Sequence, residues 1–597
     1  MSIKKPAINY TSREFVTIKN DLVNYARRYY PERFRDFSVN SFGSLMLDSV
    51  AYVGDILSFY LDYQVNETFL STALQYDNIL KIAQQMGYKP QLSPSSYGLL
   101  TCFVLVPSTN GTPNWDYAPV VKRGSKFRTT NGNLFTLMED INFKDQTKVE
   151  VVVGNVNTNT GVPTDFALRS LGQAVSGELA VSKVKLGDYE RFRTIEVPGR
   201  NITEIVSVTD SEGNYYYQVD HLTQNTVYVP LINRGDDKDT VSNILKPIAA
   251  PRRFTTIVER DKVKIQFGFG TDTDVERTLD PNNVLVKQHG KNYVSDTSID
   301  PSSLMKTDKL GIVPSSTILT IVYRINSSLS TNAGINTITA PSDVIFEFQS
   351  ESSLNAGSVS NVRKSIECTN ELPFVGSAPL PSGDEIKQRA LGAYSMQNRM
   401  VTKADFMAAV YNMPSKYGAI KKVNVIQDSD SFQQRNINIY VISVDNVGLL
   451  AKANNTIKNN LKTYLMRYKM INDSIDILDA DIINLKIDFK VASFDNANKY
   501  ATLENAKRTL SSWLQARGEY EIGEPFSVTD VFAVLKASPS VLDVISVDIG
   551  VRSGGNYATT NFNVVGNKTA DGRKILCPAN SIFEVKYKNA DIIGSVV

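Results

Sequence analysis

Residues 42–76 read FGSLMLDSVAYVGDILSFYLDYQVNETFLSTALQY, and this stretch decides how the rest of the chain is interpreted. It has the pattern of one long helix with apolar or aromatic residues around almost its whole circumference. Its main apolar residues are Leu47, Val50, Ile56, Leu57, Leu61 and Val65. A helix that is apolar on all sides has to be buried. We expect a helical bundle shared with another chain, and the alternative is an ordinary core helix within its own domain.

Three aspartates interrupt this apolar surface at regular intervals. Asp48, Asp55 and Asp62 recur at every seventh position. Seven helical residues fall only about 20° short of two full turns, so the three carboxylates form one narrow stripe. One side of the helix is therefore expected to meet water or a cationic partner. We count the three aspartates with the six apolar residues as candidate oligomerisation residues.

The composition is that of a globular protein with no strong net electrostatic field. The chain has 597 residues, enough for three or four domains, and 42% of them are hydrophobic. Lys and Arg number 64 against 62 Asp and Glu, which leaves a net charge of +2. Such a balance gives no general attraction to nucleic acid or to a membrane surface. Any recognition must therefore be local.

The start of the chain and its cysteines predict synthesis in a reducing cytoplasm. Residues 1–10 are polar and lack the apolar core of a signal peptide. No window reaches the uninterrupted apolar length of a membrane span, so we expect no membrane insertion. The three cysteines lie far apart in the sequence, which argues against a disulfide framework and for a reducing compartment.

Periodicity predicts a multidomain α+β protein. It has an N-terminal helical bundle, a β-rich middle region and a C-terminal α+β domain. The predicted parts are a helical unit over 1–92, one or two β-rich subdomains over 93–345, a linker and helix over 346–399, an α+β oligomerisation domain over 400–550, and a tail with one strand over 551–597. The Ser-rich runs 93–96 and 350–361 are expected to be soft joints between rigid bodies.

A search for catalytic or metal-binding residues finds little. His221 and His289 are the two histidines, and neither lies near a cysteine or glutamate at a metal-ligand spacing. Asp272, Asp274 and Glu276 alternate as calcium ligands sometimes do, but the rest of a calcium-loop pattern is absent. We therefore expect no enzyme activity, no metal and no cofactor.

Four sets of residues, in the same order along the chain, resemble the baseplate J-like family of contractile phage tails. Within that family they are most similar to the wedge subunits of T-even-like phages. The best-marked set comprises Gln397, Arg399, Thr402, Asp405 and Phe406. The others are the Phe42–Tyr88 region, the FGFG run at 267–270, and Ile522 to Pro525 with the residues that follow. Residues 150–250 match no motif of the family.

The resemblance implies a structural, non-enzymatic subunit of the virion tail baseplate, assembled in the host cytoplasm. Such a subunit would dimerise, contact other wedge proteins, join neighbouring wedges into a ring around the tail tube, and take part in the rearrangement on contraction. It implies no nucleic acid partner. Two alternatives remain open. A cell-wall-degrading tail protein would need a cleft with paired carboxylates, and a receptor-binding protein would use the β-rich region.

Overall fold

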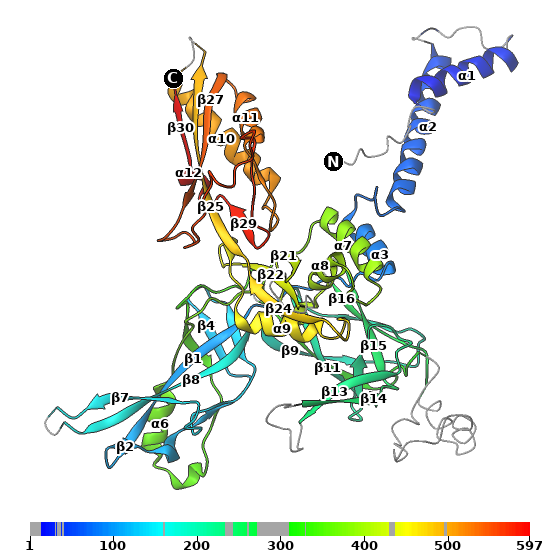
Figure 1. Ribbon diagram of the computed structural model, residues 1–597. Coiled ribbons are helices and arrows are strands. Elements are labelled where there is room, and N and C mark those ends of the chain that lie inside the picture. Colours follow the sequence, from blue (N-terminus) through cyan, green and yellow to red (C-terminus); the bar gives the residue numbers. More distant parts are fainter. Residues whose placement is uncertain are drawn as a thin grey trace. The chain divides into compact units, whose positions relative to one another are not determined.

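A computed structural model of the chain gives its fold (Figure 1). It describes residues 14–29, 32, 38, 41–158, 161–232, 243–259, 262–271, 310–326, 328, 330–428, 436–494 and 498–597. The chain forms two compact units. Unit 1 comprises Met1–Lys89 and Pro381–Tyr394, and unit 2 comprises Pro90–Leu380 and Ser395–Val597.

Unit 1 is helical, and a distant segment of the sequence completes it. Its helices are α1 (Phe15–Tyr29), α2 (Phe42–Glu67), α3 (Tyr76–Gln85) and most of α7 (Gly383–Met396). Ile79, Leu80 and Ala83 of α3 share a small core with Ile386 and Ala390 of α7. The predicted boundaries at 92 and 346–399 are therefore wrong in this respect, because α7 belongs to the core of the N-terminal unit.

The predicted continuous helix over 42–76 is wrong at its C-terminal end. α2 stops at Glu67, and a turn separates it from α3. The hydroxyls of Thr68 and Thr72 donate to the carbonyls of Val65 and Asn66 at 2.6 and 2.7 Å. Threonine hydroxyls that bond to nearby backbone carbonyls compete with helix propagation. In the sequence, the run Asn66-Glu67-Thr68 was the signal that could have indicated a helix end here.

Unit 2 begins with a β region of two large sheets, each with its own core. The first sheet has the order β18-β4-β5-β8-β1-β2, with β20 paired to β1 and β7 paired to β8. Its strands are β1 (Tyr97–Thr109), β2 (Thr112–Pro113), β4 (Lys126–Thr129), β5 (Leu134–Leu137), β7 (Glu150–Val156), β8 (Pro163–Ser176), β18 (Ile338–Asp343) and β20 (Glu367–Thr369). All its pairings are antiparallel, as the turn-punctuated alternation predicts.

The second sheet has the order β10-β16-β15-β12-β11-β17-β9. Its strands are β9 (Glu178–Lys185), β10 (Thr194–Val197), β11 (Ile202–Thr209), β12 (Tyr215–Gln218), β15 (Arg253–Val258), β16 (Val263–Phe267) and β17 (Ile318–Ile325). Two small sheets accompany them: β13 (Thr226–Ile232) with β14 (Asn243–Ala249), and β3 (Val120–Val121) with β6 (Ile141–Asn142) and β19 (Phe346–Glu347). Most of the unassigned stretch 150–250 thus builds these sheets.

The expected linker after residue 346 is a packed part of the first sheet. Helix α6 (Ala356–Lys364) buries Val359 and Val362 in the core of that sheet, and β20 pairs with β1. The soft joint expected at 350–361 therefore does not occur. The Ser and Asn residues of this run cap and flank α6, since the Asn355 side chain accepts hydrogen bonds from the backbone at Gly357 and Ser358.

The C-terminal α+β region has two cores rather than one. The first contains β21 (Lys422–Gln427), β22 (Asn436–Val444) and β24 (Ser474–Asp479) with helices α8 (Lys403–Tyr411) and α9 (Asn455–Leu465). Strand β23 (Leu450–Ala451) pairs with β22, but its Leu450 packs in the second core. The second contains β25 (Asp481–Ser493) and β27 (Val541–Arg552) with helices α10 (Lys499–Arg517) and α11 (Val528–Lys536). The predicted α+β character is confirmed.

The predicted tail over 551–597 belongs to the second of these cores. Strands β29 (Ser581–Glu584) and β30 (Ile592–Val596) both pair in parallel with β25. Ile582, Phe583 and Ile592 are buried there. The boundary drawn at residue 550 is therefore wrong, because β25 has no complete sheet without the last strands.

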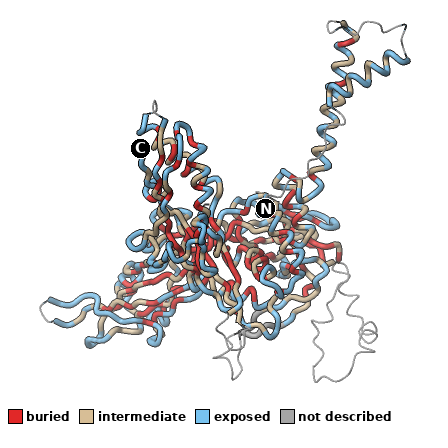
Figure 2. The backbone as a smooth tube through the Cα atoms, turned by 45° about the horizontal axis from the view of Figure 1, so that its top comes forward, coloured by how far each residue is buried: buried red, intermediate tan, exposed pale blue. Residues whose placement is uncertain are grey.

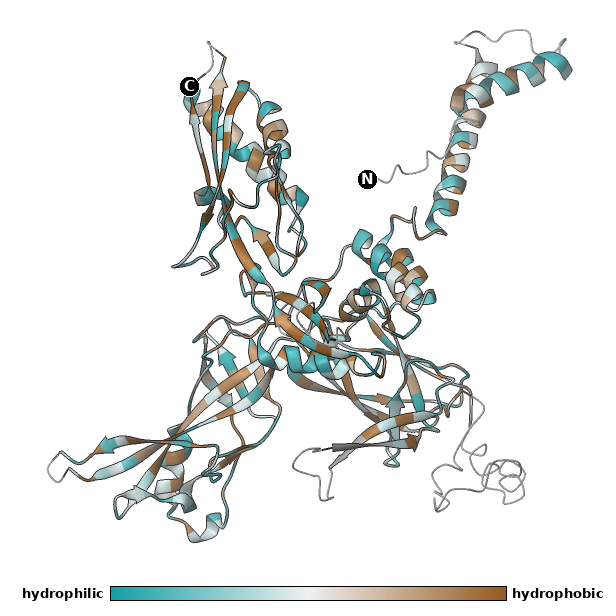
Figure 3. Cartoon of the chain, in the orientation of Figure 1, coloured by the Kyte–Doolittle hydropathy of each residue, from teal (hydrophilic) through white to brown (hydrophobic). Residues whose placement is uncertain are grey.

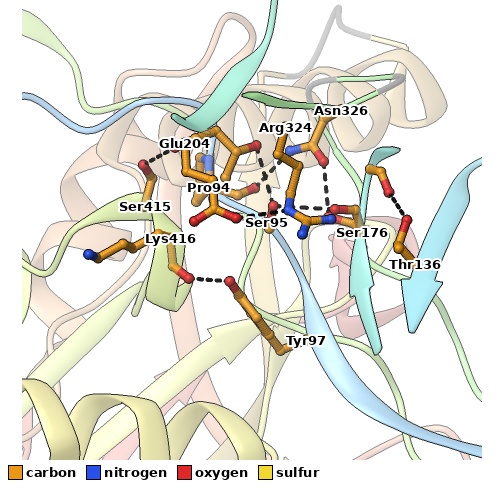
Figure 4. A network of polar contacts seen from close by, with 12 residues as sticks. Pro94, Ser95, Tyr97, Thr136, Ser176, Glu204, Arg324, Asn326, Ser415 and Lys416 are labelled. Carbon is orange, nitrogen blue, oxygen red and sulfur yellow. Dashed lines mark hydrogen bonds and ion pairs between the residues drawn. The ribbon is translucent and has the colours of Figure 1, made fainter. Parts of the chain in front are cut away.

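The segment Ser93 to Ser96, expected to be a soft joint, is instead buried in unit 2. Figure 4 shows Pro94 and Ser95 of this segment within a network of polar contacts. The Ser96 hydroxyl donates to the carbonyl of Thr331 at 2.7 Å, and its backbone N–H donates to the Ser176 hydroxyl at 3.0 Å. Ser95 donates to the hydroxyl of Thr203 at 3.3 Å. The network thus ties the start of β1 to β8, to β11 and to the segment after β17.

Candidate interaction surface

The apolar surface of α2 is exposed in this chain (Figures 2 and 3). Its buried residues are Ser44, Ala51 and Glu67. Of the six apolar candidates, Val50, Leu57, Leu61 and Val65 are exposed by 56%, 57%, 65% and 56%, and Leu47 and Ile56 are half-buried. Tyr52, Phe59 and Tyr60 add exposed aromatic rings. The chain itself therefore leaves this helix mostly uncovered.

Helix α1 covers one strip of α2. The strip is lined by small residues, since Ser44 and Ala51 are buried and a Cβ at Gly54 would lie 3.4 Å from Cδ1 of Ile18. Small side chains let two helices approach closely. On the same part of α2, Lys19 Nζ lies 2.6 Å from Asp48 Oδ1. The structure thus supplies a cation for the first carboxylate of the stripe.

The other two carboxylates of the stripe, Asp55 and Asp62, are half-buried and form no ion pair within the described residues. Both lie on the C-terminal half of α2, beyond Asp48. The predicted stripe is therefore divided between one aspartate that meets α1 and two that do not.

Glu67 fixes the end of this helix. Its buried carboxylate accepts hydrogen bonds from the backbone of Leu74 at 2.8 Å and of Gln75 at 3.3 Å, and from the Asn78 side chain at 2.9 Å. Burial alone raises the pKa of Glu67, but these hydrogen bonds and the charge of Lys387 bring the pKa below its ordinary value. The ionised form therefore locks the turn between α2 and α3.

By length and composition, α2 is also long and apolar enough to cross a membrane. The expectation that no stretch meets this test is wrong for α2. The same two properties are shared by a helix that packs among other helices. Because the three aspartates are spaced by seven residues, a span of this length would still carry at least Asp55 with Asp48 or Asp62 into hydrocarbon, and each carboxylate there is costly.

The family-motif residues 397–406 form a corner in unit 2. Gln397 and Asn398 have positive φ values of 47° and 60° and turn the chain out of α7. Thr402 then caps α8 in a capping box with Asp405, and Phe406 is buried beneath them. Arg399 lies beside Gln397, with 3.4 Å between its Nη2 and the Gln397 Oε1. These contacts give Thr402, Asp405 and Phe406 a role in the fold.

Two further exposed apolar strands were not identified from the sequence as interaction surfaces. All seven residues of β7 are exposed, including Val151, Val152 and Val153, and within the described residues β7 pairs only with β8. On β27, Leu542 and Ile545 lie at breaks in the register with β25 and are 54% and 53% exposed. The strand patterns were visible, but exposure depends on which neighbours the fold supplies.

The described residues hold no group of three or more possible metal ligands. Asp272, Asp274, Glu276 and His289 lie outside the described residues. One cavity of about 270 Å³ beside the second C-terminal core is lined by residues that include Glu519 and Glu584. Burial raises the pKa of Glu584, whose oxygens accept hydrogen bonds from Leu450 N at 3.1 Å and Asn484 Nδ2 at 2.7 Å. That carboxylate, on β29, links β23 of one sheet to β25 of the other.

Comparison with known proteins gives one informative match. Residues 17–85 match the family model of the bacteriophage baseplate protein, N-terminal domain. No curated protein sequence matches the chain. One similar solved structure is the six-fold symmetrised cryo-EM structure of the anti-feeding prophage baseplate, with 10% identity over 96% of this chain and 98% of that one. Its TM-score is 0.29, too low to support an argument. The family match includes all of α2, and it supports a structural role in a phage tail baseplate.

Proposed function

We propose that this chain is a structural subunit of a phage tail baseplate wedge. Its α2 helix packs with α2 of a second copy, and the dimer contacts other wedge proteins. Neighbouring wedges then join into a ring around the tail tube. The observation that carries the proposal is the exposed apolar surface of α2, which lies within the baseplate-like segment 17–85.

The cost of leaving α2 uncovered is large. Fully burying one leucine side chain is worth about 2 kcal/mol, and residues like Leu57 and Leu61 are more than half exposed in the free chain. Because apolar residues surround the helix, α1 and one further helix would leave part of it in water. A two-fold pair brings α1 and α2 of both chains together, and each chain offers the same surface to the other. This arrangement buries more of α2 without a new fold.

The proposal is tested by Leu57→Asp and Leu61→Asp in the full-length chain. Both side chains are exposed, so the substitutions should leave folding unchanged, whereas a carboxylate buried in a bundle is strongly unfavourable. The wild type should sediment at twice the chain mass of 66.2 kDa, and both variants near 66.2 kDa. Ile471→Asp is the matched control, because Ile471 is 96% exposed elsewhere and should leave the dimer intact.

Two outcomes would contradict the proposed pairing. If both aspartate variants sediment as the wild type does, then self-association does not use α2. If the wild type is monomeric at high concentration, then α2 pairs with a different baseplate protein and not with a second copy. In that case the same variants should fail to join the assembled wedge.

A second contact between subunits is proposed for the C-terminal α+β region, at the edge strand β27. Leu542 and Ile545 expose apolar side chains there, and β27 pairs only with β25 in the described structure. In the Leu61→Asp background, residual association at high concentration should disappear with Ile545→Lys. Val447→Lys, at a residue that is 75% exposed, should not weaken it. Equal association of all three proteins would exclude β27.

We also propose that unit 1 and unit 2 move as rigid bodies when the tail contracts. The chain passes between the units at three places, after Lys89, after Leu380 and after Tyr394. Packed cores resist continuous deformation, so change concentrates at such connections. Structures of tails before and after contraction should superpose on each unit separately. Refolding within a unit would contradict the proposal.

A further inference from the structure

Two of the three cysteines lie directly opposite each other across adjacent strands. In the antiparallel pairing of β1 with β20, Cys102 faces Cys368, between the pairs Thr101–Thr369 and Phe103–Glu367. Both cysteines belong to the core of the first sheet, with exposures of 0% and 6%, and both are free thiols. Directly opposite residues project from the same face of a sheet. The two thiols therefore share one buried site.

The strand geometry suits a covalent bond between them. Directly opposite Cα atoms in an antiparallel pair are about 4.5 or 5.5 Å apart, depending on the hydrogen-bonding of the pair. A disulfide needs a Cα separation of about 4.4–6.8 Å, so both kinds of pair fall within its range. Only a small approach of the Cβ atoms is required. In the reduced state the Cys368 thiol donates to the carbonyl of Ile338 at 3.8 Å.

We propose that Cys102 and Cys368 form a reversible disulfide when the folded protein meets a small-molecule disulfide. One cysteine thiolate attacks a sulfur of the oxidant, forming a mixed disulfide and expelling one small thiolate. The second cysteine thiolate attacks the protein sulfur of that mixed bond and expels the second small thiolate. The two protons from the cysteines pass to the two leaving thiolates. The cysteine pair loses two electrons, and the oxidant gains them.

The reaction should be slow, because both groups are poor thiolates where they lie. Burial raises the pKa of Cys368 to about 12 and that of Cys102 further. Attack therefore needs β20 to open. That strand has three residues, its Glu367 is exposed, and within the described structure it pairs with β1 alone. Short strands with one partner open locally at low cost.

The bond would fasten the segment of α6 and β20 to the first strand of the β region. Its use in nature rests on the proposed function, since a tail released from a reducing cytoplasm meets oxidising surroundings. The chemistry itself does not depend on that function. Failure of the baseplate role would leave the disulfide intact, and failure of the disulfide would leave the α2 interface intact.

The test is a thiol count on the folded full-length chain after incubation with oxidised glutathione. Under denaturing conditions the three free thiols should fall to one, and reductant should restore all three. Mass spectrometry of a digest should find one linked pair of peptides, containing Cys102 and Cys368. In Cys577→Ser, two thiols should fall to none. In Cys102→Ala and Cys368→Ala, no internal link should form.

Several results would overturn the inference. If three free thiols remain after prolonged oxidation, the inference is wrong. It is also wrong if glutathione adducts form in place of the internal disulfide. A linked pair that includes Cys577 would show that the position of Cys102 opposite Cys368 does not determine which cysteines form the disulfide. The digest of the wild-type chain decides the question even if an alanine variant folds poorly.

Discussion

Helix α2 and the segment Ser93 to Ser96 lie in environments opposite to those that their side chains favour. Leu57, Leu61 and Val65 of α2 are more than half exposed, although their transfer out of water is favourable. Ser95 and Ser96 are 0% exposed, although burial of a hydroxyl is costly unless it is hydrogen-bonded. The hydrogen-bond partners of the polar segment come from the same chain. The apolar helix is left mostly uncovered by its own chain, and we propose that another chain covers it.

This difference gives the two regions opposite responses to substitution. The buried serines belong to a network in which removal of one member leaves others unpaired in a dry site. The exposed leucines make few contacts in the free chain, so their loss is felt only on association. The predictions below test this contrast, from the largest expected effect to the smallest.

The largest effect on folding is expected from Gly177→Ala, next to Ser176 of the buried network. Gly177 has a φ of 90°, and a Cβ there would lie 2.4 Å from the carbonyl oxygen of Ile325. The strained backbone and the backbone clash together should lower the free energy of unfolding by about 3 kcal/mol. Chemical denaturation measures this loss.

Gly213→Ala is the control for that measurement. Gly213 has a similar φ of 87°, but no atom of the described residues would lie within 4 Å of a Cβ at this position. Gly213→Ala should therefore lower the free energy of unfolding only through backbone strain, by about 1 kcal/mol. Equal losses at the two glycines would mean that the close approach of the Ile325 carbonyl to Gly177 contributes nothing.

Ser176→Ala should cost about 2 kcal/mol of unfolding free energy. The Ser176 hydroxyl donates to Asn326 Oδ1 at 3.1 Å (Figure 4). It also accepts from Ser96 N at 3.0 Å, so alanine leaves both groups unpaired. Ser360→Ala on the exposed side of α6 should change the same quantity by less than about 0.5 kcal/mol. If both variants match the wild type, the buried network is not a source of stability.

The secondary structure was largely predictable where periodicity is strong. Helix α8 at Lys403–Tyr411 and strand β22 at Asn436–Val444 lie within the stretch predicted to be α+β. The environment of the serines at 93–96 was not predictable, because their partners Ser176 and Thr331 are distant in sequence. Likewise, nothing in residues 1–92 indicates that α7 would complete their core. Local composition reports propensity, whereas burial depends on long-range contacts.

The candidate site was predictable in part. The apolar circumference of α2 and the spacing of Asp48, Asp55 and Asp62 follow from the sequence alone. Sequence could not show that α1 covers only one strip and that Lys19 pairs with Asp48. Nor could it place the helix end at Glu67, because the stop depends on hydrogen bonds to Leu74 and Asn78 across the turn.

Glu67→Gln should destabilise unit 1 by about 1.5 kcal/mol at neutral pH, since it weakens the charge-assisted hydrogen bonds from Leu74, Gln75 and Asn78. The folded pKa of Glu67 lies below its ordinary value of 4.5, so its contribution is fully present above 4.5. As the pH falls through the folded pKa, that contribution is lost. Denaturation curves of wild type and variant should therefore converge in acid. A constant difference at all pH values would contradict this role.

The smallest effect is expected on α2 itself. Leu57→Ala should change the stability of the free chain by less than about 0.5 kcal/mol, because the side chain is 57% exposed. Leu80→Ala, in the small core of unit 1 and 4% exposed, should cost about 3 kcal/mol. Denaturation at low protein concentration compares them. A large loss for Leu57→Ala would mean that α2 is already covered within its own chain.

The central claim is that another protein chain covers α2 in the assembled baseplate. It is tested most directly by the labelling rate of a thiol introduced as Leu61→Cys, in the dilute free chain and in assembled baseplates. The account predicts fast labelling in the free chain and labelling at least about 100-fold slower in the baseplate, because only locally opened molecules then react. Ile471→Cys gives the reference rate for an exposed site in both states. Equal labelling of Leu61→Cys in the two states would contradict the account.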